Sequence, residues 1–262
     1  MSKYMNIEES VMTDETIYPD EISLDSFEAK DELNPKFWVG GKLKTNVRIR
    51  LLDIAHDFFE DLDVRWIKPK DVVLTGSLAN YNWSKYSDID LHIIVDFSEV
   101  YDKTEFVEDY FNSKKIIWNE AHDTLKIYGF PVEVYVEDYK APSESSGVYS
   151  LVTNEWINEP EQMDDGKMHR DYIKDVSAKC MNKIDELSDK CETKDIEVLK
   201  KVSHKAKRLF DGLKDLRKKG LKSPYKEMSS GNIIWKVLRR TEYLDKLYDI
   251  IDKTYNKIKT IY

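Results

Sequence analysis

Apolar residues in the first half of the chain recur at helical spacing in two places. The first such run follows Thr45, which we interpret as an N-cap, and predicts a helix at the start of the folded part. Its apolar positions are Val47, Leu51, Leu52, Ala55, Phe58, Phe59 and Leu62. A second helix is predicted over residues 106–118, where aromatic and aliphatic residues again recur every three or four positions.

Between and after these helices the pattern is that of strands. Residues 71–75 form a short apolar run, and residues 89–95 alternate apolar and polar positions. Two further strands are predicted at 125–128 and 132–136, joined by a tight turn at Gly129. The first half of the chain therefore predicts an α/β module.

The second half changes to long amphipathic helices, with three apolar stripes at helical spacing. The stripes are Ile173, Val176, Cys180, Ile184 and Leu187; Ile196, Leu199, Val202, Leu209, Leu213 and Leu216; and Ile234, Val237, Leu238, Leu244, Leu247, Ile251, Tyr255 and Ile258. We expect these helices to pack together as a bundle.

These patterns predict three parts of the chain. Residues 1–34 have no sustained apolar period and are expected to be an acidic, disordered arm. Residues 35–155 form the α/β domain and residues 156–262 the helical domain. The predicted fold class is α+β, with a C-terminal helical bundle.

Composition narrows the class of protein. The chain has 262 residues, of which 41% are apolar and 35% charged, and no apolar run approaches the roughly 20 residues of a membrane span. The N-terminus shows no basic stretch followed by an apolar one, so we expect a cytoplasmic protein without a membrane partner. Cys180 and Cys191 fall on one predicted helix, about 16 Å apart along its axis, and are expected to stay reduced.

The net charge of -9 is unevenly distributed. Residues 1–34 carry ten acidic and two basic side chains, whereas residues 194–226 carry twelve basic and four acidic ones. The basic helix of 194–226 is a candidate contact for an RNA or DNA backbone, although such runs are more often solvated faces. Lys236, Arg239 and Arg240 are further candidates, for contact with a triphosphate.

The chemistry is concentrated in residues 76–97, where Gly-Ser follows one predicted strand and Asp-Ile-Asp begins the next. Asp88 and Asp90 are two residues apart, so on a strand their carboxylates lie on one face. Glu133 occupies the corresponding register on a later strand and completes a set of three carboxylates. Carboxylate oxygens suit Mg²⁺, so the predicted cofactor is a pair of Mg²⁺ ions, with Mn²⁺ as an alternative.

The residues before this acidic strand suit phosphate binding. Gly76 allows the backbone to approach a phosphate closely, and Ser77 offers a hydroxyl and amide donors at a predicted helix N-terminus. His92 shares the face of Asp90 and is interpreted as a hydrogen-bonded neighbour rather than a ligand. Tyr81, Trp83 and Tyr86 are interpreted either as base-stacking residues or as packing for the short helix.

In this order and context, Gly76, Ser77, Asp88, Asp90 and Glu133 resemble the fingerprint of the DNA polymerase beta superfamily of nucleotidyltransferases. The resemblance covers about residues 45–138 and implies a polymerase-beta-like module with a mixed sheet. It also implies that Asp88 and Asp90 bind both metals, that Glu133 helps to activate the acceptor hydroxyl, and that Gly76 and Ser77 bind the phosphates of an NTP. More narrowly, the segments LNPKFW and LTGSLANYNWSKYSDIDLHIIVD resemble nucleotidyltransferase-domain proteins of tailed bacteriophages, which would place the protein in a host cytoplasm.

The expected activity is therefore transfer of a nucleoside monophosphate from an NTP to a hydroxyl of RNA, protein or a small molecule. The alternative is an inactive nucleotidyltransferase-fold protein with a binding or phage-structural role. Asp123, Glu137 and Asp138 are alternatives to Glu133 as the third acid. The sequence departs from the superfamily after Gly-Ser, where Asn80, Tyr81, Asn82 and Trp83 stand in place of a frequent Arg-Gly.

Overall fold

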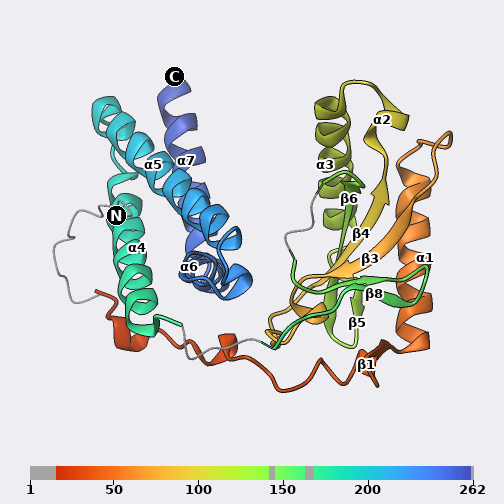
Figure 1. Ribbon diagram of the computed structural model, residues 1–262. Coiled ribbons are helices and arrows are strands. Elements are labelled where there is room, and N and C mark those ends of the chain that lie inside the picture. Colours follow the sequence, from red (N-terminus) through yellow and green to blue (C-terminus); the bar gives the residue numbers. More distant parts are fainter. Residues whose placement is uncertain (1–15, 142–144, 163–167, 261–262) are drawn as a thin grey trace. The chain divides into compact units, whose positions relative to one another are not determined.

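The computed structural model describes residues 16–141, 145–162 and 168–260 and divides into two compact units. One unit comprises Ser26–Asp165, and the other combines the N-terminal segment up to Asp25 with Gly166–Tyr262. Figure 1 labels most of their helices and strands. The predicted fold class, an α/β module followed by a helical region, is confirmed.

The first unit is built on a mixed six-stranded sheet in the order β5-β6-β4-β3-β7-β8. Its strands are β3 (Asp71–Thr75), β4 (Ile89–Val95), β5 (Lys126–Ile127), β6 (Phe130–Asp138), β7 (Val148–Ser150) and β8 (Glu155–Asn158). Strands β4 and β6 run parallel, whereas every other neighbouring pair is antiparallel. A separate two-stranded ribbon consists of β1 (Trp38–Val39) and β2 (Lys42–Leu43).

Helices α1 (Thr45–Asp61) and α3 (Thr104–Ala121) contribute to one hydrophobic core with the sheet, and the short α2 (Phe97–Val100) follows β4. The aliphatic side chains of β3, β4 and β6 that belong to this core are Val72, Leu74, Ile89, Leu91, Ile93, Val95, Val132 and Val134. Because strand side chains alternate, the residues between them, including Asp90 and Glu133, point to the opposite face. We call these two surfaces the core face and the acidic face.

Two tight turns position the strands. Tyr128 and Gly129, with φ of 53° and 91°, form the two-residue connection between β5 and β6, as positive φ at both central residues of such a hairpin requires. At the free edge of β6, the Asn119 side chain of α3 accepts from Val134 N at 3.1 Å and donates to Val134 O at 3.4 Å. This amide pair takes the place of a missing neighbour strand beside Glu133 and Tyr135.

The second unit contains α4 (Arg170–Lys190), α5 (Ile196–Leu221), α6 (Ser230–Arg240) and α7 (Tyr243–Lys259), with the short turn η5 (Lys226–Met228) between α5 and α6. Most residues of the predicted stripes are buried or partly buried in this unit, whereas Ile196 and Tyr255 are exposed. The third predicted stripe is not one helix: it is broken between α6 and α7, where Glu242 has a φ of 63°. At the C-terminal end of α6, Thr241 Oγ1 donates to Val237 O at 2.8 Å.

The predicted disordered arm needs correction. Residues 1–15 lie outside the described part of the chain, but residues 16–34 contain the short turns η1 (Pro19–Glu21) and η2 (Asp25–Phe27), and Ile22, Leu24 and Phe27 are buried. The backbone of Ile17 exchanges two hydrogen bonds with the Asn182 side chain of α4, at 2.8 and 2.9 Å. The prediction of disorder relied on the acidic composition and did not take these few apolar residues into account.

The other predicted boundaries differ less. The first unit extends to Asp165 rather than residue 155, because β8 still pairs with β7. Thr45 is the first residue of α1, and Lys44 occupies the N-cap position without a side-chain cap. Cys180 and Cys191 are free and buried, and burial raises the pKa of the Cys180 thiol to about 12. Within the described residues, every helix is too short or too polar to cross a membrane.

Candidate active site

The site is organised by the register of β3, β4 and β6. Asp90 pairs with Thr75 on β3 and with Glu133 on β6, so these three residues form one row across the sheet. Asp88 lies immediately before β4, at the same end. The structure thus brings Asp90 and Glu133 to adjacent strand positions, whereas Glu137 lies in the row of Ile94 and Asp138 in that of Val95.

Gly76 joins β3 to the short turn η3 (Ser77–Ala79) with a φ of 72°, which favours glycine. A Cβ atom at this position would lie 1.7 Å from Asp90 Oδ2 and 2.6 Å from its Cγ. No side chain fits between the turn and this carboxylate. Gly76 is therefore required by the close approach of the backbone to Asp90, in addition to its backbone conformation.

Ser77 has a different environment from the one the sequence predicts. The element that follows Gly76 is one 3-10 turn, which is too short for the dipole of a full helix. The Ser77 hydroxyl is buried and donates to Ser87 Oγ at 2.7 Å, and Ser87 Oγ also accepts from Ser84 N at 3.0 Å. These bonds tie the Gly-Ser turn to the residues that precede Asp88.

Asn80 is the organising residue that the sequence pattern alone does not reveal. It is fully buried, and its Nδ2 donates to Gly76 O at 2.6 Å and to Ser145 Oγ at 3.3 Å. Its Oδ1 accepts from Ser146 Oγ at 2.7 Å. The backbone at Gly147 packs so closely on this turn that a Cβ there would lie 2.0 Å from Ala79 O. The residue that departs from the superfamily pattern therefore fixes the carbonyl of Gly76.

Tyr135, on the acidic face, is a further residue of the site that the sequence analysis did not identify. Its hydroxyl donates to Glu133 Oε2, and its ring stacks on His92 with centroids 4.6 Å apart and planes at 12°. Lys115 Nζ of α3 lies 4.5 Å from the same ring centroid. The strict alternation of Glu133, Tyr135 and Glu137 along β6 is the sequence signal that would have found it.

The electrostatics of this face are dominated by negative charge. Burial raises the pKa of the Tyr135 phenol, and the neighbouring charges of Asp90 and Glu133 raise it further, with a smaller contribution from Asp88. Tyr135 therefore keeps its proton at neutral pH and acts as a hydrogen-bond donor to Glu133. His92 Nδ1 lies 3.0 Å from Glu137 Oε1; burial acts to raise the pKa of Glu137, but the contact with His92 lowers it overall. His92 thus faces Glu137 and Tyr135, in accord with its interpretation as a neighbour.

The donor chemistry suits a hard divalent cation, because the row offers carboxylate oxygens on adjacent strands. Within residues 16–141, 145–162 and 168–260, however, no three His, Cys, Asp or Glu side chains converge closely enough to form a metal-binding group. Glu133 is engaged by Tyr135 instead. The predicted three-carboxylate metal cluster is therefore present as a row of residues and not as a closed ligand set.

Comparison with known families agrees with this geometry. Residues 56–154 match the family model of the nucleotidyltransferase domain. The matched segment contains the Gly76 turn, all three carboxylates and the strands that carry them. The first unit is thus similar to nucleotidyltransferase domains over this segment, which supports an NTP-using transferase activity for that unit.

Other comparisons add little. No match was found among curated protein sequences. Among solved structures, a STING-associated CdnE c-di-GMP synthase from Capnocytophaga granulosa matches with 11% identity over 83% of this chain and 82% of that chain. Its TM-score of 0.21 is too low to carry an argument. None of these matches supports the predicted relation to bacteriophage proteins.

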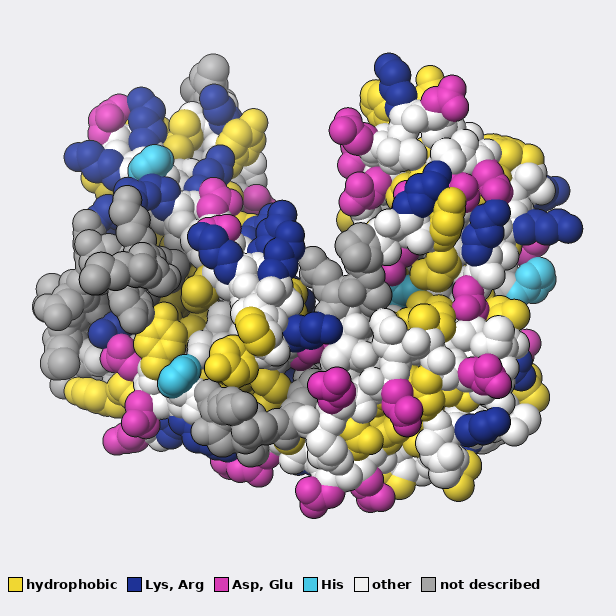
Figure 2. All heavy atoms as spheres, in the orientation of Figure 1, with side chains coloured by type: hydrophobic (Ala, Val, Ile, Leu, Met, Phe, Trp, Pro, Cys, Tyr) yellow, Lys and Arg dark blue, Asp and Glu magenta, His cyan; other side chains and the backbone are white. Residues whose placement is uncertain are grey.

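The remaining predicted contacts involve residues of other elements. Trp83 Nε1 donates to Glu32 O at 2.9 Å, which favours the packing interpretation of that aromatic residue. Lys and Arg side chains are exposed along α5 (Figure 2), and ion pairs within the helix include Lys200 with Glu197 and Lys219 with Asp215. Lys236, Arg239 and Arg240 belong to α6 in the second unit.

Proposed function

We propose that this protein is a nucleotidyltransferase that transfers a nucleoside monophosphate from an NTP to an acceptor hydroxyl and releases pyrophosphate. The observation that carries the proposal is the approach of the Gly76 backbone to the Asp90 carboxylate, in register with Glu133. Metal ions that neutralise a bound phosphate must lie close to it, so a phosphate-binding turn must lie beside the carboxylates that hold those ions. The Gly76 turn lies beside Asp90 in this way. The nucleotidyltransferase-domain match over residues 56–154 supports the same reaction class.

Each residue has a proposed role. Asp88 and Asp90 would hold two Mg²⁺ ions, with Glu133 as the third ligand and as the carboxylate nearest the acceptor hydroxyl. Bound there, the ions would neutralise charge on the triphosphate and lower the pKa of the acceptor hydroxyl. The backbone of Gly76 and Ser77 would orient the phosphates, and Asn80 would hold that turn in place through the Gly76 carbonyl.

The first test is calorimetric titration of the protein with each NTP, with and without Mg²⁺. The matched variant is Asp90→Asn, which keeps the size of the side chain and removes its charge. We expect metal-dependent binding of at least one NTP in the wild type, and loss of metal-dependent turnover by more than about a hundredfold in the variant. Unchanged turnover in a correctly folded Asp90→Asn protein would contradict the two-metal assignment.

The same titration separates this function from that of an inactive domain. Absence of NTP binding under every metal condition would favour the alternative of an inactive nucleotidyltransferase-fold protein. For an active protein, the dependence of acceptor binding on salt distinguishes RNA from a small molecule, because contacts with phosphates release counterions. If α5 contacts RNA, the charge reversals Lys205→Glu and Lys207→Glu should flatten that salt dependence.

A further inference from the structure

The two units of the chain differ in the sign of their charge. Residues 26–165 contain 15 basic and 28 acidic side chains, a net charge of -13. Residues 166–262 contain 25 basic and 15 acidic ones, a net charge of +10, and nine of the basic residues with only three acidic ones belong to α5. In a protein whose overall charge is -9, the positive charge is therefore concentrated in the helical unit, above all on α5.

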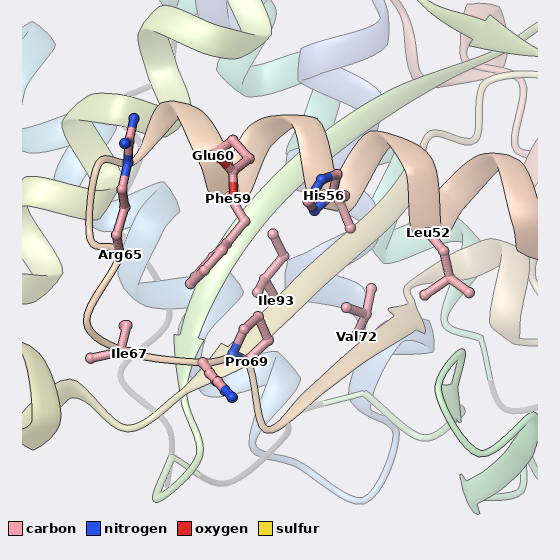
Figure 3. A pocket seen from close by; sticks show the side chains of 11 residues that line it. Leu52, His56, Phe59, Glu60, Arg65, Ile67, Pro69, Val72 and Ile93 are labelled. Atoms are coloured by element: carbon pink, nitrogen blue, oxygen red, sulfur yellow. The ribbon is translucent and has the colours of Figure 1, made fainter.

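The pocket of the first unit shows no comparable excess of charge. It has a volume of about 510 Å³ and lies between the flank of α1 and strands β3 and β4 (Figure 3). Arg65 and Lys68 line it together with Glu60, and Arg65 also lies 3.6 Å from Asp63, so positive and negative side chains are equal in number. The charge of this pocket thus indicates no class of ligand, whereas the charge of α5 does.

The cations of α5 are directed to solvent. Apart from the partly buried Arg217, every basic side chain of this helix is exposed. Ion pairs within the helix hold Lys200 and Lys219. Five others form no hydrogen bond or ion pair with the described residues, namely Lys201, Lys207, Arg208, Lys214 and Lys218. These five are available to neutralise a bound polyanion.

Aromatic rings lie beside these cations where α5 meets α6 and α7. Phe210 of α5 packs on Tyr248 of α7, with ring centroids 4.5 Å apart, and on Trp235 of α6, with centroids 5.9 Å apart. Lys214 Nζ lies 5.6 Å from the centroid of Phe210, and the guanidinium carbon of Arg217 lies 5.2 Å from that of Trp235. Tyr248 is 47% exposed, so one ring of the cluster is open to an external partner.

The spacing along α5 places cations and rings on one side of the helix. Lys207, Phe210, Lys214 and Arg217 are separated by three or four residues, which brings them into one row. Carboxylates lie near the rings as well, for example Asp245 one turn before Tyr248. They do not balance the cations, because α5, α6 and α7 together contain 16 basic and six acidic side chains.

Two other polyanions fit this surface less well. A helix that binds an anionic membrane inserts an apolar face into the lipid, but the apolar face of α5 is buried in the bundle, where Leu199, Val202 and Leu213 are at most 3% exposed. A nucleic-acid duplex offers phosphates but keeps its bases stacked inside. A single strand offers both phosphates for the lysines and base faces for an exposed ring.

We propose that α5 and Tyr248 bind a single-stranded nucleic acid, with its phosphates at Lys207 and Lys214 and a base stacked on the Tyr248 ring. Because every base has a face that can stack on an aromatic ring, little sequence preference is expected. The proposal goes beyond nucleotidyl transfer, since it concerns binding of the strand by the helical unit whether or not the strand is the acceptor.

The test is fluorescence anisotropy of a labelled single-stranded RNA of about 12 nucleotides, titrated with the full chain at several salt concentrations without NTP or divalent metal. We expect saturable binding that weakens with salt. In Lys207→Gln/Lys214→Gln the slope of log affinity against log salt concentration should fall in magnitude by about 1.4, since each contact with a single-strand phosphate contributes about 0.7. The control Lys42→Gln/Lys126→Gln removes two exposed charges from the first unit and should leave the slope unchanged.

Two tyrosine variants test the stacking. Tyr248→Ala should weaken binding of the single strand by about tenfold. Tyr101→Ala removes a tyrosine of similar exposure, 55%, from the first unit and should have no effect. A duplex of the same sequence should bind more weakly than the single strand and should be insensitive to Tyr248→Ala. Thermal unfolding of each variant establishes that the fold is kept.

Three results would overturn the proposal: no saturable binding of the RNA, an unchanged salt slope in a folded Lys207→Gln/Lys214→Gln variant, or equal binding of duplex and single strand in both wild type and Tyr248→Ala. Preferential binding of phosphatidylserine vesicles would overturn it in favour of a membrane. The Asp90→Asn variant should bind the RNA as the wild type does, so failure of this proposal and failure of nucleotidyl transfer are observed separately.

Discussion

The seven residues of strand β4 contribute alternately to the core face and to the acidic face of the sheet. Leu91 and Ile93 point to the core face and are fully buried, whereas Asp90 and His92, their immediate neighbours, point to the acidic face. The core face depends on shape and volume, and the acidic face on charge and hydrogen-bond direction. Substitutions one residue apart should therefore affect different properties: stability on one face and catalysis on the other.

The largest effect is expected at Gly76, where the chain turns from β3 into η3. In Gly76→Ala the added methyl group would clash with the Asp90 carboxylate, and φ near 72° would become strained. Displacing a reacting group by about 1 Å costs on the order of a hundredfold in rate, so we expect at least that loss in kcat. The backbone strain adds about 1–3 kcal/mol of destabilisation.

Steady-state kinetics and urea unfolding of Gly76→Ala measure the two consequences separately. Gly129→Ala is the matched control, since φ there is also positive but no atom lies within 4 Å of the added Cβ. It should lose stability without losing turnover. Equal loss of turnover in both variants would show that strain alone, and not contact with Asp90, explains the effect.

The second prediction concerns the core face directly beside the site. Leu91→Ala removes a fully buried side chain, so we expect about 2–5 kcal/mol of destabilisation. At temperatures where the variant remains folded, metal-dependent NTP binding should be close to that of the wild type. Urea unfolding paired with calorimetry checks this; a variant that keeps its stability but loses NTP binding would remove the distinction between the two faces.

The third prediction sharpens the acidic face. In Tyr135→Phe the ring remains to stack on His92 and beneath Lys115, while the hydrogen bond to Glu133 is lost. Residues that orient metal ligands typically change metal affinity or activity by about 10–100-fold, and we expect a change of that size here. Titration with Mn²⁺ measures it without requiring turnover.

Tyr110→Phe is the control for Tyr135→Phe, because the Tyr110 hydroxyl donates to Leu62 O, outside the site. It should leave Mn²⁺ affinity unchanged. If Tyr135→Phe also leaves it unchanged although the wild type binds Mn²⁺, then Tyr135 does not position Glu133.

These contrasts also explain which features could be read from sequence. The helical stripes and the alternation along β4 are local patterns, so the helices and strands could be predicted, whereas the shared face of Asp88 and Asp90 stays a prediction. The pairing of Asp90 with Glu133 depends on register between strands about forty residues apart, and it was inferred from order and type alone. The structure supplies that register.

Other features depend on contacts that no local pattern encodes. The Asn80 side chain donates to Gly76 O within its own turn. Its other hydrogen bonds are with Ser145 and Ser146, which lie about 65 residues later in the chain. Ile22, Leu24 and Phe27 are buried inside a segment whose average composition is acidic. The average charge of this segment therefore predicted disorder, although a few of its apolar side chains are buried.

The smallest effect is expected for Glu186, a carboxylate that we expect to contribute to stability and not to catalysis. It serves as a reference for the carboxylates of the acidic face. Glu186 on α4 pairs with Lys183 at 2.6 Å and with Lys190. Burial acts to raise the pKa of Glu186, but its hydrogen bonds with the two lysines lower it overall. A lowered folded-state pKa stabilises the protein above the unfolded-state pKa of about 4.3, and this stabilisation is lost as pH falls through the folded-state value.

We therefore expect Glu186→Gln to cost about 0.5 kcal/mol at pH 7, because helix-surface pairs contribute little, and to leave NTP binding and turnover unchanged. The stability difference from the wild type should shrink as the pH is lowered below about 4. Urea unfolding at pH 7, 5 and 3.5 measures it. A difference that persists at pH 3.5 would mean that Glu186 stabilises α4 through packing rather than charge. A loss of turnover would mean that a carboxylate of the helical unit also affects the chemistry.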